Sequence, residues 1–448
     1  MTPVSPVTGH PVPGGPVTGP PVTGPVTGGP VTGGPVAPTT LVTRTVALET
    51  SVDLAAVAGD HGVLWIRPGA VSLAGRGAAA RVSVCLGDGR GGRAGEDVAA
   101  VLAAIEWDGP HPPVAMGALP FARSGRAEMV VPAVLVRRQA DGSHWLTVTS
   151  PDPGPDVDEI RRRLVATPPS TEGPGPREFR VRSEIDRDAW CRLVGDAAAA
   201  VAAGRLDKVV LARAVTVVAD RPFRPADVAG RLMASHPSCM VFSMAGFVGA
   251  SPELLVDRHG EQVLSQPLAG TAARTGPGGG DDELAPRLLS SAKERGEHRL
   301  VVDAVSAALA RYCDELSVPP VPALVPLGTL AHLGTLIVGR LRRPLPTALD
   351  LVGAVHPSPA VGGTPTDAAL DYIDEVEGLE RGRYAGPVGW VDGNGDGCFA
   401  LGLRSAQIEG RRARLMAGVG VVAGSDPVAE LAETDLKLQP MLAALVRP

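Results

Sequence analysis

Two separated stretches of this chain carry the same glutamate spacing, KERGEH at residues 293–298 and AGVGVVAGSDPVAELAETDLK at residues 417–437. The second stretch opens with a run that is typical of a strand and continues into an amphipathic pattern that predicts a helix. Because residues three apart lie on one face of a helix, each glutamate pair projects both carboxylates in one direction. We therefore predict two helices that present four carboxylates to one cation. These carboxylates belong to Glu294, Glu297, Glu430 and Glu433.

The cation that suits such a set is a hard divalent ion. Mg2+ requires near-octahedral oxygen coordination, keeps several waters, and is usually bound by one or two carboxylates together with oxygens of a substrate. A single E-x-x-E pair more often marks a solvated helix face, since charged side chains are almost never buried without a partner. The sequence around the two pairs therefore has to decide between a Mg2+ site and two ordinary helix surfaces.

The composition favours small molecules over polymers as ligands. The 448 residues carry a formal net charge of −6 without a basic block, which argues against nucleic-acid binding. Five scattered cysteines lack C-x-x-C spacing and fit a reducing compartment. No apolar run approaches the roughly 18 residues that span a bilayer, and the N-terminus lacks a signal-peptide pattern. We expect a cytoplasmic protein with neither a nucleic-acid nor a membrane partner.

Composition also divides the chain into three parts. Residues 1–39 repeat PVTG and PVTGG units with few large apolar side chains, and we predict a disordered tail there. Residues 40–180 contain short β-branched runs broken by Gly and Pro, which predict a mostly β-stranded N-terminal part of the fold. Residues 181–448 alternate strand-like runs such as KVVLARAVTVV with helical patterns and contain both glutamate pairs.

Ten short motifs follow one another between residues 200 and 445. In chain order they read KVVLAR, SPELL, PLAGT, KERGEH, HLGT, HPSPAVGGTP, RGRYAGPVGW, GDG, LRSA, and AGVGVVAGSDP followed by ELAETDLK. This order resembles the chorismate-utilising enzymes, the family of isochorismate, salicylate, anthranilate and aminodeoxychorismate synthases. The resemblance implies an α+β fold with two large β-sheets packed face to face, helices outside, and a site near the sheet interface. It also implies that the four glutamates hold Mg2+, which binds the ring carboxylate of chorismate and offsets charge as a hydroxyl leaves.

The resemblance assigns two catalytic residues. Lys208 opens KVVLAR where water-adding members of the family carry a lysine, and it is implied to be the general base that activates water. A lysine is ordinarily protonated at neutral pH, so this role requires burial or a nearby positive charge; a solvent-facing strand-end lysine is the ordinary alternative. Glu253 in SPELL is implied to be the general acid that protonates the departing 4-hydroxyl, which needs a poorly solvated pocket.

Further positions are implied to bind chorismate. Arg404 in LRSA and Tyr384 in RGRYAGPVGW match positions that hold the enolpyruvyl carboxylate, a task that suits a bidentate guanidinium. Gly418 and Gly420 would let backbone N–H groups approach the ligand closely. The remaining positions are Gly270 and Thr271 on the ring-carboxylate side, His332 near the ring, and Lys437.

Within the family, the residues favour water over ammonia as the nucleophile. Ala269 stands where the aminodeoxychorismate branch carries a nucleophilic lysine, and Lys208 argues against the anthranilate branch. The stretches HPSPAVGGTPTDAAL and YAGPVGWVDGNGDG resemble the isochorismate branch more than the salicylate branch. We therefore predict a Mg2+-dependent isochorismate synthase, an isomerase that forms isochorismate from chorismate without a redox cofactor. We expect it to act as a monomer, without an amidotransferase subunit. Its product would enter siderophore biosynthesis, menaquinone biosynthesis or the formation of another metabolite.

Three alternatives stay open. A salicylate synthase would go on to eliminate pyruvate from isochorismate, a non-catalytic relative would only bind chorismate, and a generic Mg2+-dependent hydrolase would use the same carboxylates. One departure from the isochorismate branch is Cys398, because the chain reads GDGC where those enzymes commonly read GDGE. We predict that this cysteine is structural rather than nucleophilic, since nothing near it in the sequence favours a thiolate.

Overall fold

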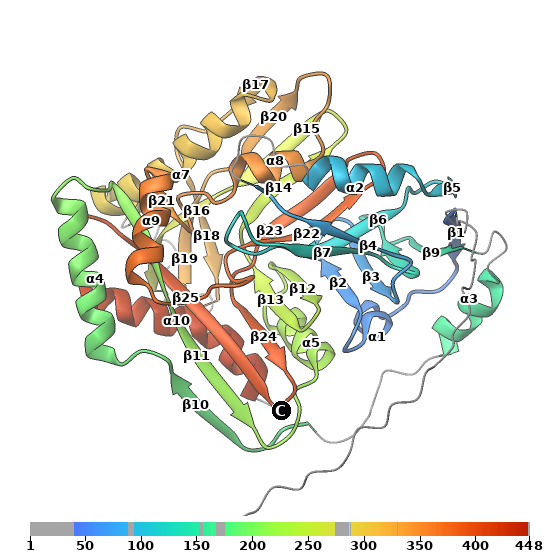
Figure 1. Cartoon of the computed structure of the whole chain (residues 1–448), viewed down its shortest axis with the longest axis horizontal. Coiled ribbons are helices and arrows are strands. Elements are labelled where there is room, and N and C mark those ends of the chain that lie inside the picture. Colours follow the sequence, from blue (N-terminus) through green and yellow to red (C-terminus); the bar gives the residue numbers. More distant parts are fainter. Residues whose placement is uncertain are drawn as a thin grey trace, which may run out of the picture. The chain divides into compact units, whose positions relative to one another are not determined.

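Antiparallel strand pairing organises the part of the chain that the computed structural model describes (Figure 1). Within that part, the only parallel pair is β1 (Val42–Leu48) with β5 (Glu106–Asp108). The predicted disordered tail, residues 1–39, lies outside the described residues. The structure describes residues 40–87, 94–151, 156–166, 175–273, 286, 288–328 and 330–446.

The largest sheet has thirteen strands and joins distant parts of the sequence. β2 pairs with β12, with Val63 opposite Met244, so the predicted parts 40–180 and 181–448 share this sheet. Thr40–Pro448 clusters into one compact unit. In spatial order the sheet contains β10 (Phe179–Ser183), β11 (Lys208–Ala219), β25 (Arg412–Val421), β24 (Ser405–Glu409), β13 (Phe247–Ser251), β12 (Met240–Met244), β2 (Val63–Ile66), β3 (Ser72–Arg76), β8 (Val134–Arg138), β9 (His144–Ser150), β1 and β5, while β21 (Gly363–Thr364) pairs with β11.

Two further sheets complete the β-structure of the described ranges. The nine-stranded sheet contains, in spatial order, β17 (Cys313–Ser317), β20 (Ile337–Leu341), β15 (Gln262–Gln266), β14 (Leu254–His259), β23 (Gly397–Leu401), β22 (Pro387–Asp392), β6 (Val114–Ala118), β7 (Ala127–Val131) and β4 (Ala80–Val84). The three-stranded sheet contains β16 (Leu268–Ala273), β19 (Leu330–Gly334) and β18 (Ala323–Leu327).

The two large sheets pack face to face through an apolar core, as the resemblance implies. Trp65 and Phe242 from the thirteen-stranded sheet lie in one buried cluster with Met116 and Val388 from the nine-stranded sheet. Alternate residues of each strand point inward, which brings these side chains together. Cys398 lies in the same cluster, and burial raises the pKa of its thiol, which disfavours the thiolate that a nucleophile needs. The surroundings of Cys398 thus agree with a structural role.

Helices lie outside the sheets (Figure 1). Among them, α5 (Pro225–Ser235) and α10 (Pro427–Val446) pack against strands of the thirteen-stranded sheet. Val217 of β11 packs in one cluster with Leu232 of α5 and with Leu438 and Met441 of α10. The α+β class is confirmed by this arrangement. The described helices are α1 (Leu54–Ala58), α2 (Ala94–Ala103), α3 (Val157–Ala166), α4 (Arg187–Ala202), α5 (Pro225–Ser235), α7 (Ala292–Ala310), α8 (Ala348–Val355), α9 (Thr366–Val376) and α10 (Pro427–Val446).

Both helices predicted from the glutamate spacing are present, as α7 and α10. The hydroxyl of Ser291 accepts a hydrogen bond from the backbone N–H of Glu294, which caps the N-terminus of α7. The carboxylate of Asp426 accepts one from the backbone N–H of Ala429 at 2.7 Å in the first turn of α10. Such caps satisfy N–H groups that have no partner inside the helix, and so they fix where each helix begins.

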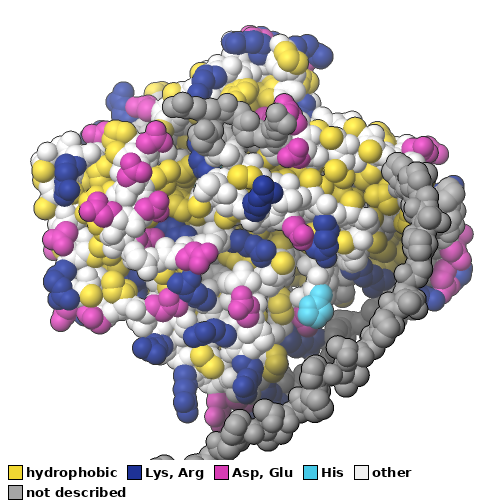
Figure 2. Space-filling view, in the orientation of Figure 1, with side chains coloured by type: hydrophobic (Ala, Val, Ile, Leu, Met, Phe, Trp, Pro, Cys, Tyr) yellow, Lys and Arg dark blue, Asp and Glu magenta, His cyan; other side chains and the backbone are white. Residues whose placement is uncertain are grey.

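The surface carries mixed charge. Basic and acidic side chains are interspersed on the face drawn in Figure 2, and neither sign forms a continuous block there. Among the helices of the described ranges, none combines the length and the apolar composition that a membrane crossing requires.

Candidate active site

The site is built on one face of the β11–β25 ladder. Val210 lies opposite Gly420 in this antiparallel register. Since side chains alternate between the faces of a sheet, Lys208 and Val210 share a face with Gly418 and Gly420. Among the described strands, β24 follows β25 only as far as Leu415, so the next part of β25 has a free edge. The ammonium of Lys437 on α10 occupies this edge and donates to the carbonyl oxygen of Gly418 at 2.9 Å.

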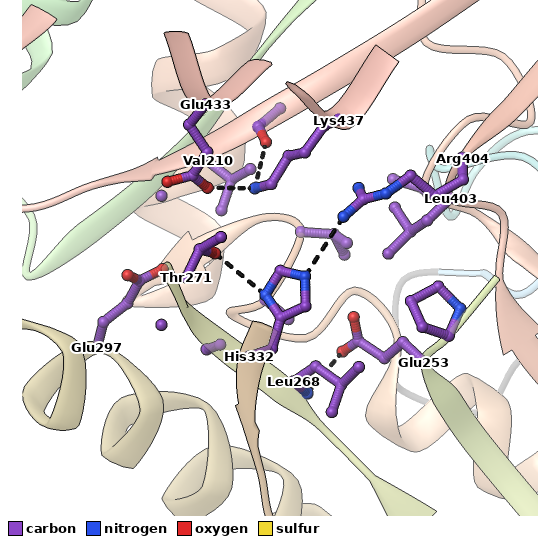
Figure 3. Close-up of a pocket in the computed structure, with 18 of the residues that line it drawn as sticks. Val210, Glu253, Leu268, Thr271, Glu297, His332, Leu403, Arg404, Glu433 and Lys437 are labelled. Atoms are coloured by element: carbon purple, nitrogen blue, oxygen red, sulfur yellow. Dashed lines mark hydrogen bonds and ion pairs between the residues drawn. The ribbon is translucent and has the colours of Figure 1, made fainter. Parts of the chain in front are cut away.

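A cavity of about 70 Å³ lies against this face. All of the residues predicted to form the site line it except Glu294 and Glu430 (Figure 3). Arg381 and Val361 also line the cavity. Both belong to motifs quoted above, but the sequence predicted no role for either residue. The cavity therefore gathers residues from the thirteen-stranded sheet, from the three-stranded sheet, from the helices α7 and α10, and from the segments between strands. The predicted residues that line it are Lys208, Glu253, Gly270, Thr271, Glu297, His332, Tyr384, Arg404, Gly418, Gly420, Glu433 and Lys437.

Lys208 begins β11 and is almost completely buried, with 1% of its side chain exposed. Its Nζ lies 2.8 Å from Oε1 of Glu297 on α7. A buried ammonium is costly unless it has a partner of opposite charge, and Glu297 provides that partner. The lysine therefore points into the cavity. This excludes the alternative that Lys208 is a strand-end lysine whose side chain faces solvent.

Glu253 immediately precedes β14 and is 5% exposed. Burial raises the pKa of its carboxyl to about 7, although a hydrogen bond from the N–H of Leu268 and the positive charge of Lys208 act in the opposite direction. The donated hydrogen bond from Leu268 is 3.4 Å long. At neutral pH a substantial fraction of this carboxyl is protonated, so it can donate a proton.

His332 on β19 connects two other predicted residues. Its Nδ1 lies 3.1 Å from Oγ1 of Thr271, and its Nε2 lies 3.4 Å from Nη2 of Arg404. Because a guanidinium can only donate, Nε2 is the acceptor, and Nδ1 carries the proton that it donates to Thr271. Burial and the nearby charge of Arg404 lower the pKa of His332 to about 3. The imidazole is therefore neutral and orients Arg404 and Thr271 in the site.

Tyr384, Arg404 and Lys437 also line the cavity. Burial raises the pKa of the Tyr384 phenol to about 12, so the phenol stays protonated and can donate a hydrogen bond. Arg404 has φ of +47°, a left-handed conformation that costs a residue other than glycine on the order of 1 kcal/mol. Such strain is frequent where a side chain must be aimed at a ligand.

The four glutamates are neighbours, but each has a protein partner. Glu294 accepts from the N–H of Thr271 at 2.9 Å, and Glu430 lies 3.0 Å from Nζ of Lys293. Glu433 lies 2.6 Å from Nζ of Lys437; burial alone would favour its neutral form, yet the lysine holds its pKa below the usual range. Within the described ranges, no group of three or more His, Cys, Asp or Glu side chains is arranged to hold a metal ion.

The donor set nonetheless fits Mg2+ by its chemistry. All four side chains offer oxygen, the ligand that Mg2+ prefers. Burial and the negative charges of Glu297 and Glu433 raise the pKa of Glu294. Burial also raises the pKa of Glu430, and Glu433 contributes to that shift. The ionised forms of carboxylates that repel one another are stabilised by a nearby cation. In this structure Lys208, Lys293 and Lys437 supply that positive charge.

Comparison with known proteins agrees with the motif order. Residues 67–446 match the family described as chorismate binding enzyme. Isochorismate synthase DhbC of Bacillus subtilis is 36% identical over 362 residues, which cover 78% of this chain and 86% of that protein. Isochorismate synthase MenF of the same organism is 36% identical over 328 residues, or 71% and 69% of the two chains. The structure of MenF, the menaquinone-specific isochorismate synthase from Escherichia coli, superposes with a TM-score of 0.76 at 26% identity and covers 91% of this chain and 95% of that one.

Proposed function

Because the chain belongs to the chorismate binding enzyme family, we propose that it is an isochorismate synthase, an isomerase that converts chorismate to isochorismate. The observation that carries the proposal is the presence of Lys208 and Glu253 in one buried cavity. One is a potential base and the other is a carboxyl whose pKa of about 7 keeps it partly protonated. A water-adding enzyme needs both functions in the same pocket.

The reaction adds a hydroxyl at one ring carbon and removes one at another. Lys208 takes a proton from a water whose oxygen forms the new bond to C2, and the ring double bonds shift as the C4–O bond breaks. Glu253 gives its proton to the departing hydroxyl, which leaves as water. One water enters and one leaves, so the product is an isomer of the substrate. A proton then returns from Lys208 to Glu253, directly or through solvent, and restores both residues for the next turnover.

The cavity also supplies charge for a dianionic substrate. Arg404 and Lys437 carry positive charge into it, and Tyr384 offers a neutral donor. We assign Arg404 and Tyr384 to the enolpyruvyl carboxylate, and Gly270 and Thr271 to the side of the ring carboxylate. Neutral His332 fixes the direction of Arg404 without adding a charge of its own. Two carboxylates held in this way orient the ring for attack at C2.

We assign Mg2+ to Glu294, Glu297, Glu430 and Glu433, on the oxygen donor set of α7 and α10. When bound, the ion supplies positive charge that offsets the ring carboxylate and the departing hydroxyl. Oε1 of Glu297, one of these carboxylates, also lies 2.8 Å from Nζ of Lys208, so the ion and the proposed base would be neighbours.

The test is product analysis after purified protein is incubated with chorismate at neutral pH, with and without Mg2+. We expect a Mg2+-dependent chromatographic peak of unchanged mass and new retention time, which is isochorismate. Salicylate together with pyruvate would assign the chain to the salicylate branch. No turnover in either condition would leave a non-catalytic chorismate-binding protein.

We further propose that the protein acts alone and in the cytoplasm. Water needs no delivering subunit, so the purified chain should be fully active as a monomer. Size-exclusion chromatography combined with the activity assay tests this. Ammonium-dependent formation of an aminated product, or activity confined to a larger assembly, would contradict it.

Replacement of Gly420 by alanine should lower the catalytic rate without unfolding the protein. A Cβ atom at this position would lie 2.2 Å from Oε1 of Glu297 and 2.7 Å from Cε of Lys208, so the ion pair has to move. A displacement of about 1 Å in a catalytic group can lower the rate about 100-fold. We expect a loss of kcat of this order, measured by steady-state kinetics.

Gly230→Ala is the matched control for this variant, because a Cβ on Gly230 in α5 meets nothing within 4 Å. Its kinetics should equal those of the wild type. Equal kinetics for Gly420→Ala as well would show that the Lys208–Glu297 pair tolerates displacement.

A further inference from the structure

One edge of β11 has a gap in its strand pairing beside the cavity. Within the described ranges, β21 pairs with Lys208 and Val209, and β10 pairs with Val215–Ala219. The N–H of Val210 donates to the carbonyl oxygen of Gly362 at 2.7 Å, at one end of the gap. Between these partners, the carbonyl of Val210 and the N–H of Ala212 are buried and face no strand. Buried backbone groups need hydrogen-bond partners, so other groups have to fill this gap.

A buried ion pair fills it. Oε2 of Glu377 accepts from the N–H of Ala212 at 2.8 Å, and Nη2 of Arg381 donates to the carbonyl oxygen of Val210 at 2.7 Å. The carboxylate and the guanidinium thus take the places of the carbonyl and the N–H that a neighbouring strand would offer. Side chains exposed by only 3% and 1% therefore replace one rung of the sheet.

The geometry of the pair fixes the guanidinium in one position. Nε and Nη2 of Arg381 donate to the two carboxylate oxygens of Glu377 at 2.7 and 2.6 Å. Nη1 donates to the carbonyl oxygen of Val361 at 2.8 Å, and the guanidinium lies over the ring of Phe121, 4.3 Å from its centroid. A planar fork with this many fixed partners has little freedom to rotate.

Arg381 consequently connects three segments that line the cavity: β11, the loop before β21, and the segment that contains Arg381 and Tyr384. Val210 follows Lys208 by two residues on β11, Val361 belongs to the loop that precedes β21, and Tyr384 follows Arg381 by three residues. We propose that Arg381, held by Glu377, is a positioning residue for the reaction, because it sets the strand that carries Lys208 relative to the other two segments. This proposal rests on the proposed function, since it concerns the placement of the base that this function requires.

Arg381→Lys tests the role of the fork. A lysine keeps the charge beside Glu377, but one ammonium at the end of a flexible chain cannot reproduce the bidentate pair and both carbonyl contacts. We expect kcat to fall about tenfold to 100-fold with KM nearly unchanged, because the base is displaced while the carboxylate-binding groups remain. The melting temperature should fall, because a buried carbonyl oxygen loses its donor, and the control variant below shows how much of the loss of kcat such destabilisation explains.

Arg258→Lys is the matched control. Arg258 on β14 is equally buried, lies 2.8 Å from a carboxylate oxygen of Asp396, and donates to a backbone carbonyl, that of Asn394, but it does not line the cavity. The Arg258→Lys variant therefore reproduces the loss of stability expected from replacing a buried, paired arginine. Its kcat should equal that of the wild type at a comparable melting temperature.

Chemical rescue separates positioning from general destabilisation. In Arg381→Ala, guanidinium at a non-denaturing concentration should refill the cavity beside Glu377 and restore part of kcat, whereas the same concentration of sodium should not. If Arg381→Ala fails to fold, the comparison of kcat between Arg381→Lys and Arg258→Lys still tests the positioning role. Equal kcat losses in Arg381→Lys and Arg258→Lys, or a loss confined to KM, would overturn the proposal. A wild-type protein that forms no isochorismate would instead refute the proposed function.

Discussion

Lys208→Ala will lose about 100- to 10,000-fold in kcat for isochorismate formation, the range that a positioned general base contributes. Lys208 is 1% exposed and its ammonium lies 2.8 Å from Glu297, so its removal leaves a small space next to an unpaired carboxylate. Neither water nor alanine can take a proton from the attacking water. Chorismate should still bind, because Arg404 and Lys437, which also line the cavity, are unchanged.

The measurement is single-turnover and steady-state kinetics with chromatographic detection of isochorismate. Lys208→Met is the companion variant, since it keeps most of the side-chain volume and removes only the amine. Both variants should bind chorismate with near-normal affinity and have wild-type circular dichroism. Near-normal turnover by either would remove Lys208 from the mechanism.

Glu253→Gln will lose a comparable factor in kcat, because glutamine has the shape of the acid but no proton to give to the departing hydroxyl. In the wild type, kcat/KM should fall as pH rises through about 7, since burial raises the pKa of this carboxyl to about 7 and the ionised form cannot act as an acid. The pH profile of kcat/KM tests this. An alkaline limb well away from pH 7, or substantial turnover by Glu253→Gln, would assign the acid to another group.

The same pKa predicts a change in stability. Its value in the folded protein, about 7, lies above the ordinary 4.5, so the folded state binds the proton more tightly than the unfolded chain. The stabilisation that the protonated form provides is complete below pH 4.5 and is lost as pH rises through 7, by about 3 kcal/mol. Glu253→Gln has no such loss, so its melting temperature relative to the wild type should rise between pH 5 and pH 8.

Local patterns were sufficient to predict the two glutamate helices and the strand that begins at Lys208. Helical period and capping residues are properties of neighbouring residues, and α7 and α10 formed where those patterns lie. The face-to-face sheets followed from the order of the motifs, and the structural superposition with MenF of Escherichia coli agrees with them.

Long-range partners could not be predicted from the sequence. Nothing near Lys208 indicates that its carboxylate is Glu297, because Glu297 lies 89 residues further along the chain and the fold brings α7 to the start of β11. Strand order is non-local in the same way, and so the pairing of β2 with β12 does not appear in any periodicity. Nothing in the sequence indicated the contacts of Arg381, for a related reason. In its motif only Tyr384 was assigned a role, and the gap in the pairing of β11 that Arg381 fills is visible only in the structure.

The partners of the glutamates have a consequence for covalent chemistry. The chain contains only three lysines, Lys208, Lys293 and Lys437, and each of them lies against one of the four acidic side chains of α7 and α10. Apart from the terminal amine, an acylating reagent therefore has no lysine to modify away from these four glutamates. Exposure of the three side chains falls from 40% at Lys293 to 13% at Lys437 and 1% at Lys208. Peptide mapping after mild acylation should follow that order, so the chain carries its own graded set of labelling positions around the four glutamates.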